Sequence, residues 1–97
     1  MNKLNFKGYE SIPEHTKMAL RMYVEEGYMP GGFLTAVLCN DLFRAVDHAD
    51  SETAAALVQI VKFIYNRVPN TAWGSAQQMR HYISRLHDEN LVDELAG

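Results

Sequence analysis

The fold is decided by the stretch at residues 51–68, SETAAALVQIVKFIYNRV. Asp50 or Ser51 suits the N-cap of a helix there, and Pro69 would end that helix because proline cannot continue it. Between these limits apolar side chains recur at helical spacing. The stripe consists of Ala54, Leu57, Val58, Val61, Ile64, Tyr65 and Val68. We therefore predict one long amphipathic helix whose stripe faces the core.

Upstream, the sequence predicts a helix over about residues 12–26. Ser11 and Glu14 have the spacing of a capping box, Pro13 suits a first turn, and Gly27 is a natural stop. Its apolar stripe comprises Ile12, Thr16, Ala19, Leu20, Tyr23 and Val24.

Between these two helices, the chain predicts a turn at residues 28–32 and a helix from Phe33 to about Ala49. This helix is apolar on nearly every side, and such a helix is either central or covered on a second side by oligomerisation.

Downstream, Ser75 and Gln78 form a second potential capping box. The helix that it opens has a core face of Met79, Tyr82, Ile83 and Leu86. The stripe slips at Leu91, so we expect a break at residues 87–90 and a short tail helix over residues 91–95.

The pattern as a whole predicts one all-α domain, a compact bundle of about four helices. Residues 1–10 are expected to form an extended arm that packs on the body or on a neighbouring subunit. Residues 11–87 would form the helical core and residues 88–97 the tail. No segment has the period-two alternation of a strand.

Composition narrows the class of function. The 97 residues carry a net charge of −3, which argues against nucleic-acid binding because such proteins usually present a basic surface. The single cysteine, Cys39, excludes an internal disulfide and, together with the lack of a signal-like N-terminus, favours a reducing cytoplasm. No apolar run is long enough for a membrane span.

Three groups of residues are candidates for a binding site. The first is Gly31 and Gly32, with Phe33 directly after them, at the start of a helix. Backbone amides in such a turn can converge on an anion, although the glycine spacing and lysine of a phosphate loop are missing. The alternative is a tight turn that needs unusual backbone angles.

The second group is Asn40 and Asp41, with Arg44 and His48 on the same predicted ridge. Asp41 falls within an apolar stripe, where a carboxylate must be paired. The group is either an internal salt bridge or helix cap, or a polar centre in a binding site that Asn66 could join.

The third group is Trp73, Gly74 and Ser75, beside the start of the last helix. An indole next to backbone donors suits a nucleotide or a protein partner. The alternative is that the indole covers one end of the core.

The sequence offers little for catalysis, metal binding or cofactors. The four histidines have no i, i+4 pair, and one cysteine cannot build a structural zinc site. Cys39 lies among apolar residues, which suits an inert thiol better than a nucleophile. There is no serine in a nucleophile elbow. We expect no enzyme activity, no cofactor and no metal.

Three segments carry a resemblance to a family of small bacteriophage and prophage proteins. They are YMPGGFLTAVLCNDL at residues 28–42, FIYN at residues 63–66 and PNTAWGS at residues 69–75. The family resembles this chain over roughly residues 12–76 and has no established activity. The resemblance implies a phage-encoded accessory protein in the cytoplasm of a bacterial host.

The leading hypothesis is a non-catalytic binding protein that inhibits or modulates a host defence protein. Self-association is also expected, with a dimer through the helix at residues 33–49 and the N-terminal arm. The alternative is a small-molecule-binding protein that captures an anionic nucleotide through Gly31, Gly32, Arg44, Asn66 and the Trp73 corner. A weaker alternative is a nucleic-acid binder or mimic.

Overall fold

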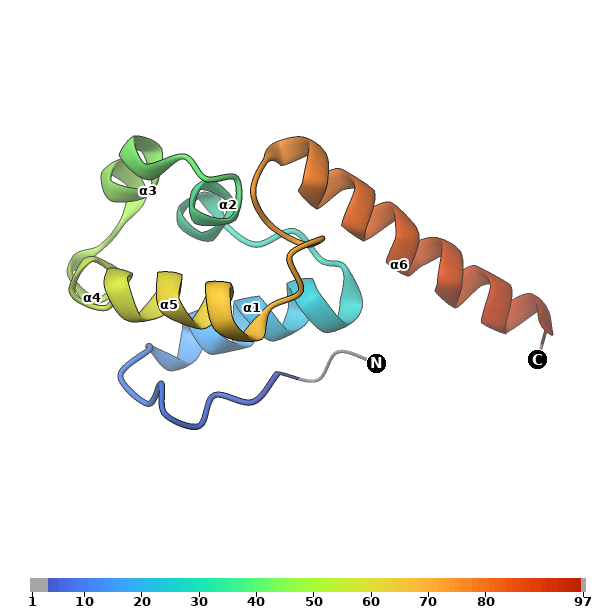
Figure 1. The fold of residues 1–97 in the computed structure, drawn as a ribbon, viewed down its shortest axis with the longest axis horizontal. Coiled ribbons are helices and arrows are strands. Elements are labelled where there is room, and N and C mark those ends of the chain that lie inside the picture. The colour runs from blue at the N-terminus through green and yellow to red at the C-terminus, as the bar shows by residue number, and fades with distance from the viewer. Residues whose placement is uncertain (1–3, 97) are drawn as a thin grey trace.

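The computed structural model describes the backbone of residues 4–96 and the side chains of residues 4–88. No strand occurs in this range, so the predicted all-α class is confirmed. The helices, labelled in Figure 1, are α1 (Glu14–Glu26), α2 (Gly32–Leu38), α3 (Leu42–His48), α4 (Ser51–Ala55), α5 (Leu57–Arg67) and α6 (Ala76–Ala96).

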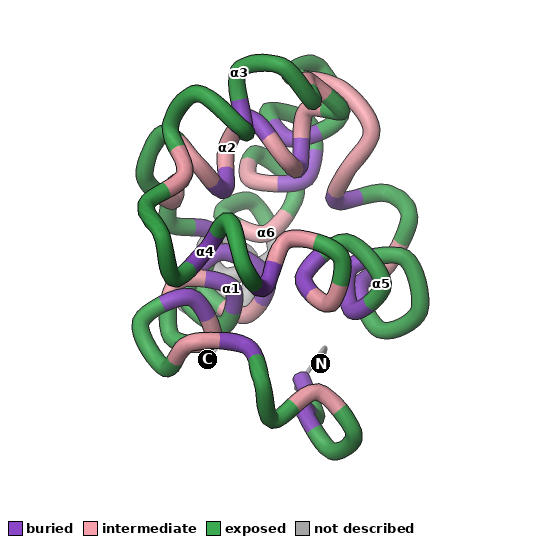
Figure 2. Tube along the Cα trace, turned by 90° about the vertical axis from the view of Figure 1, so that its left-hand side faces the viewer, coloured by how far each residue is buried: buried purple, intermediate pink, exposed green. Residues whose placement is uncertain are grey.

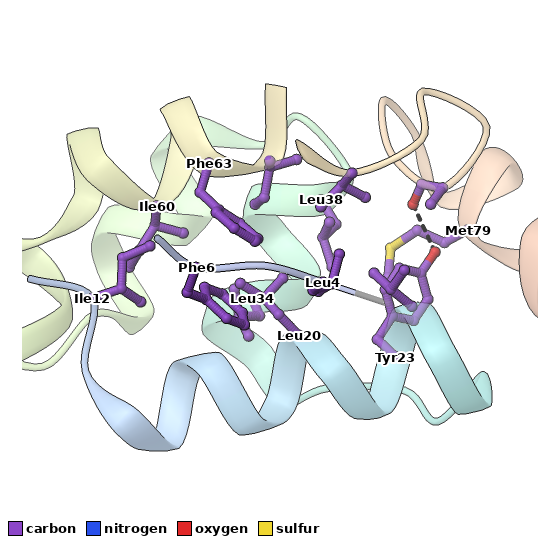
Figure 3. Close-up of a cluster of buried hydrophobic side chains, with 14 of the residues drawn as sticks. Leu4, Phe6, Ile12, Leu20, Tyr23, Leu34, Leu38, Ile60, Phe63 and Met79 are labelled. Atoms are coloured by element: carbon purple, nitrogen blue, oxygen red, sulfur yellow. Dashed lines mark hydrogen bonds between the residues drawn. The ribbon is translucent and has the colours of Figure 1, made fainter. Parts of the chain in front are cut away.

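The core lies between α1 and α5, with α2 behind them and the first turns of α6 at one end (Figure 3). Its fully buried side chains include Leu20 and Tyr23 of α1, Leu38 of α2 and Phe63 of α5. The Tyr23 hydroxyl donates a 2.7 Å hydrogen bond to the carbonyl of Ala72, drawn as the dashed line in Figure 3. The core thus satisfies its deepest hydroxyl with the loop before α6.

The described part of the N-terminal segment packs on the body of its own chain, which is one of the two placements predicted for the arm at residues 1–10. Leu4 and Phe6 are buried, and the Phe6 ring stacks on Phe63 with centroids 4.2 Å apart. Figure 3 shows Phe6 between α1 and α5. Two apolar side chains gain more by covering this seam than by extending into water. Residues 1–3 lie outside the described part.

The charged side chains of Glu25 and Arg67 bond to the backbone of the N-terminal segment. The backbone N–H of Leu4 donates to Glu25 Oε2 at 3.2 Å. The Arg67 guanidinium donates to the carbonyls of Asn5 at 2.7 Å and Lys7 at 3.2 Å. The described part of the segment therefore packs on its own chain.

The single helix predicted from Phe33 to Ala49 is wrong, because two short helices, α2 and α3, occupy this range. Asn40 has a left-handed backbone with φ of 63°. Its N–H bonds to Val37 O, and the N–H of Asp41 bonds back to Ala36 O at 2.9 Å, which is the Schellman pattern of a helix end. Asp41 then caps α3 by accepting from the N–H of Arg44. Asn40 thus ends α2, and Asp41 begins α3.

The long helix predicted over residues 51–68 is interrupted at Ala56, and its predicted core face is only partly correct. Ile64 and Val68 are buried as expected, but the other buried residues of this stretch include Ile60 and Phe63. The predicted residues Val58, Val61 and Tyr65 are exposed. The helix is apolar on two sides, and the side with Ile60 and Phe63 packs in the core, where Phe63 stacks on Phe6 of the N-terminal segment.

The stripe predicted for α1 is confirmed, since Thr16, Leu20, Tyr23 and Val24 are buried. The capping box at Ser11 is wrong. The N-cap position is Pro13, with no side-chain cap hydrogen bond, and Ser11 lies in a turn before it.

The last helix, α6, is longer than predicted. Its start is confirmed, because Ser75 Oγ accepts from the N–H of Gln78 at 3.1 Å. Met79 and Tyr82 are buried as expected. The break at residues 87–90 and the separate tail are wrong, because α6 runs without interruption to Ala96. Residues 87–90 contain neither proline nor glycine, so nothing in them stops the helix. The apolar stripe ends here because the helix leaves the body of the molecule at this point (Figure 1).

Candidate functional site

A groove of about 230 Å³ lies between α3 and α5 and is closed at one end by the loop before α6. Its lining is mostly aliphatic and aromatic, which is typical of a binding pocket. The lining residues are Val37, Asn40, Asp41, Leu42, Ala45, Leu57, Val61, Ile64, Tyr65 and Trp73. We call this feature the α3–α5 groove.

The polar residues of the groove lie at the junction between α2 and α3. Because Asn40 ends α2 and Asp41 begins α3, both side chains fall at the same edge. Asp41 Oδ1 accepts from the Arg44 N–H at 3.3 Å, and Asp41 Oδ2 lies 3.3 Å from Arg44 Nε. The side chains of this pair are 45% and 69% exposed, so Asp41 is accessible and not an internal salt-bridge partner. Surface pairs of this kind are weak.

The aromatic end of the groove is formed by Tyr65 and Trp73. Their ring centroids lie 6.0 Å apart with planes tilted by 53°. The indole N–H of Trp73 donates to Val68 O at 3.2 Å, which fixes the ring against the end of α5. Trp73 is half-buried against the core and also lines the groove. Both predicted roles of this indole, core cover and binding surface, are therefore compatible with its position.

Large apolar side chains stand exposed on the helices beside the groove. On α3 they are Leu42, Phe43 and Val46, and Phe43 is 87% exposed. On α5 they are Val58, Val61 and Tyr65, and Tyr65 is 72% exposed. Figure 2 shows long exposed stretches on both helices. Large exposed apolar side chains on the two helices that border a groove favour an interaction site there.

The first predicted group lines a different hollow. Gly31, Gly32 and Phe33 lie beside His15 of α1 and His48 of α3 in a depression of about 240 Å³. A Cβ on Gly32 would lie 3.4 Å from His48 Nδ1, an ordinary van der Waals distance, so the imidazole packs beside this turn. His48 therefore lines this hollow, whereas Asp41 lines the α3–α5 groove.

The remaining predicted residues have structural partners. Asn66 is exposed, and its amide donates to the Tyr9 hydroxyl at 3.0 Å. Gly74 has φ of 120° and donates its N–H to Leu38 O at 2.7 Å, which ties the Trp73 loop to α2. Ser75 caps α6. Of the three predicted groups, the groove joins only Asn40, Asp41 and Trp73.

Sequence reasoning missed most of the groove wall. The sequence predicts a place in the core for Leu57, Val61 and Tyr65, because they recur at helical spacing. The available signal was a second apolar stripe on the same helix, at Ala56, Ile60 and Phe63. Two apolar stripes on one helix indicate two separate contacts.

The chemistry available in this part of the molecule is that of binding. Burial and, second, the charge of Asp41 raise the pKa of the Cys39 thiol, which lies 3.4 Å from the Met79 sulfur. A thiol held protonated in this way is a poor nucleophile. Among the described residues, no group of three or more His, Cys, Asp or Glu side chains could hold a metal ion.

Comparison of the chain with protein-family models, with curated proteins and with solved structures finds no match. Within residues 4–96, no helix has the length and hydropathy needed to cross a membrane.

Proposed function

We propose that this protein is a non-catalytic binding protein and that the α3–α5 groove is where it docks another protein. The observation that carries the proposal is the apolar groove between two rows of exposed apolar side chains. Aromatic side chains are enriched at protein interfaces, and Tyr65 and Trp73 both line this groove.

The resemblance to small phage and prophage proteins supports a cellular location and a class of partner for this function. Such a protein acts in the cytoplasm of a bacterial host, and its partner is a host protein, such as a defence protein whose activity it blocks. Inhibition by docking needs a complementary surface and no catalytic group, which fits the chemistry of the groove.

The nucleotide alternative has less support from the geometry. Gly31 and Gly32 line one hollow and Trp73 lines another, while Asn66 is bonded to Tyr9. A nucleotide could not use all of these groups in one site. The net charge of −3 also disfavours an anionic ligand.

A peptide-selection experiment tests the proposal. A displayed library of random 12-residue peptides is selected on the wild-type protein, and each enriched peptide is tested on two variants. Val61→Glu places a carboxylate in the groove, whereas Met18→Glu places one at an exposed apolar position of α1, outside the lining and away from α3 and α5.

We expect enriched peptides to bind the wild type and Met18→Glu equally and to lose at least tenfold in affinity for Val61→Glu. Circular dichroism melts would confirm that both variants are folded. Enriched peptides that bind all three proteins alike, or a selection without enrichment, would contradict the proposal.

Self-association is a second candidate, because Phe43 of α3 is 87% exposed. The described part of the N-terminal segment packs on its own chain, so a dimer would have to form mainly through α3.

A further inference from the structure

The charge distribution inside the groove identifies the chemistry of its occupant. Asp41 is the one residue charged at neutral pH among the described residues that line the groove. Its neighbour Arg44 does not line the groove and shares with Asp41 a surface pair that is largely exposed. A carboxylate at the edge of an apolar groove attracts a cation and repels an anion.

The groove also offers an apolar surface to the stem of a long basic side chain. Tyr65 and Trp73 line it together with Asp41, and Tyr65 is largely exposed. The lining also includes Leu57, Val61 and Ile64, and aliphatic and aromatic side chains of this kind suit a methylene stem.

We propose that the groove receives a lysine or arginine side chain of the partner, presented by a segment with apolar neighbours. The apolar stem packs on the aliphatic and aromatic lining, and the cationic group lies by the Asp41 carboxylate. Arg44 is displaced from Asp41 when the partner binds, at little cost because the pair is exposed. This inference rests on the proposed function and names the chemistry of the partner.

The test uses Trp73, which is the only tryptophan of the chain and lies in the groove wall. Its fluorescence is followed during titration with n-hexylammonium, n-hexanol and hexanoate, which share one stem and differ in charge. The experiment is repeated with Asp41→Asn, which keeps an oxygen to cap α3 but removes the charge. Asp47→Asn is the matched control, an exposed carboxylate of α3 outside the groove.

We expect hexylammonium to bind the wild type and Asp47→Asn about two- to fivefold more tightly than hexanol, the range for an exposed ion pair. Hexanoate should bind more weakly than hexanol. In Asp41→Asn the preference for the ammonium should disappear, while hexanol still binds.

A second arm separates a protein segment from a free amine as the source of the cation. N-acetyl-Leu-Lys-Leu-amide should bind the wild type more tightly than its Leu-Gln-Leu counterpart, and Asp41→Asn should remove the difference. Binding of hexylammonium without binding of the peptide would assign the groove to free amines and overturn the proposal.

The other outcomes are equally decisive. Equal binding of all three hexyl probes would leave the groove as a docking site and overturn the preference for a cation. No response to any probe, with light scattering showing a dimer, would mean that a second copy covers the groove. No response from a monomer would contradict the groove as a docking site together with this inference.

Discussion

Asn40 carries the turn that separates α2 from α3, and its left-handed backbone sets the groove edge. A residue with a Cβ and no local hydrogen-bonding group is strained at φ of 63°. We expect Asn40→Ala to lower the free energy of unfolding by about 1 kcal/mol, and Asn40→Gly to leave it unchanged or slightly raised.

Urea denaturation of the two variants measures this difference. Equal stability of Asn40→Ala and Asn40→Gly would show that the turn relaxes to another conformation. The stabilities of the two variants can be compared directly, because Asn40 is exposed and is not part of the core cluster.

Asp50 begins α4 with a capping box, and this makes its contribution to stability depend on pH. Hydrogen bonds from the backbone N–H and then the hydroxyl of Thr53 lower the pKa of Asp50 from its ordinary value of 3.8. Because the folded-state pKa is the lower one, the carboxylate stabilises the fold above pH 3.8 and this contribution is lost as the pH falls further.

The matched variant is Asp50→Asn, which can still cap the helix but does not titrate near pH 4. We expect the wild type to melt at a higher temperature than Asp50→Asn at pH 7, and the difference to shrink below about pH 4. A difference that stays constant from pH 7 to pH 2.5 would exclude the carboxylate as its origin.

At the scale of the element, α5 has one face in the core and one face on the groove. Ile60 is fully buried and Val58 is 64% exposed on the same helix. We expect Ile60→Ala to cost about 2–5 kcal/mol and Val58→Ala less than about 0.5 kcal/mol. Chemical denaturation of both variants checks the assignment of the faces, and similar costs would mean that α5 is rotated about its axis.

How well the sequence predicts the buried face of each helix depends on whether that helix has one apolar stripe or two. Helix content and the faces of α1 and α6 follow from apolar spacing and from the Ser75 cap, since these segments have one apolar stripe each. In α5 the same reasoning selects the wrong residues, because two apolar stripes compete and only tertiary packing chooses Phe63 over Val61.

The junction at Asn40 and Asp41 shows a different reason for error. Asparagine in a left-handed turn followed by an aspartate cap is a readable signal, but the surrounding apolar residues continue at helical spacing and mask it. The polar character of Asp41 and the lone Trp73 nevertheless marked two residues that the fold brings to one groove.

For the whole molecule, the exposed apolar surface on α3 and α5 affects how the protein behaves at high concentration. We expect wild-type protein to be monomeric at low micromolar concentration and to self-associate reversibly at several hundred micromolar. Phe43→Glu should stay monomeric at both concentrations without loss of thermal stability, since Phe43 is 87% exposed.

Light scattering across this concentration range makes the measurement, with Met18→Glu on α1 as a control. Met18 is also exposed and apolar but lies outside the groove surface. Wild-type protein that remains monomeric throughout would leave the surface to partners other than a second copy.

The packing of Phe6 on Phe63 has a consequence for synthesis on the ribosome. Phe6 leaves the exit tunnel before its stacking partner, since Phe63 follows Phe6 by 57 positions. The Phe6 ring must therefore wait for this partner until α5 has been translated. The nascent chain of this small domain cannot complete its core piece by piece, and the core closes only after α5 has left the tunnel.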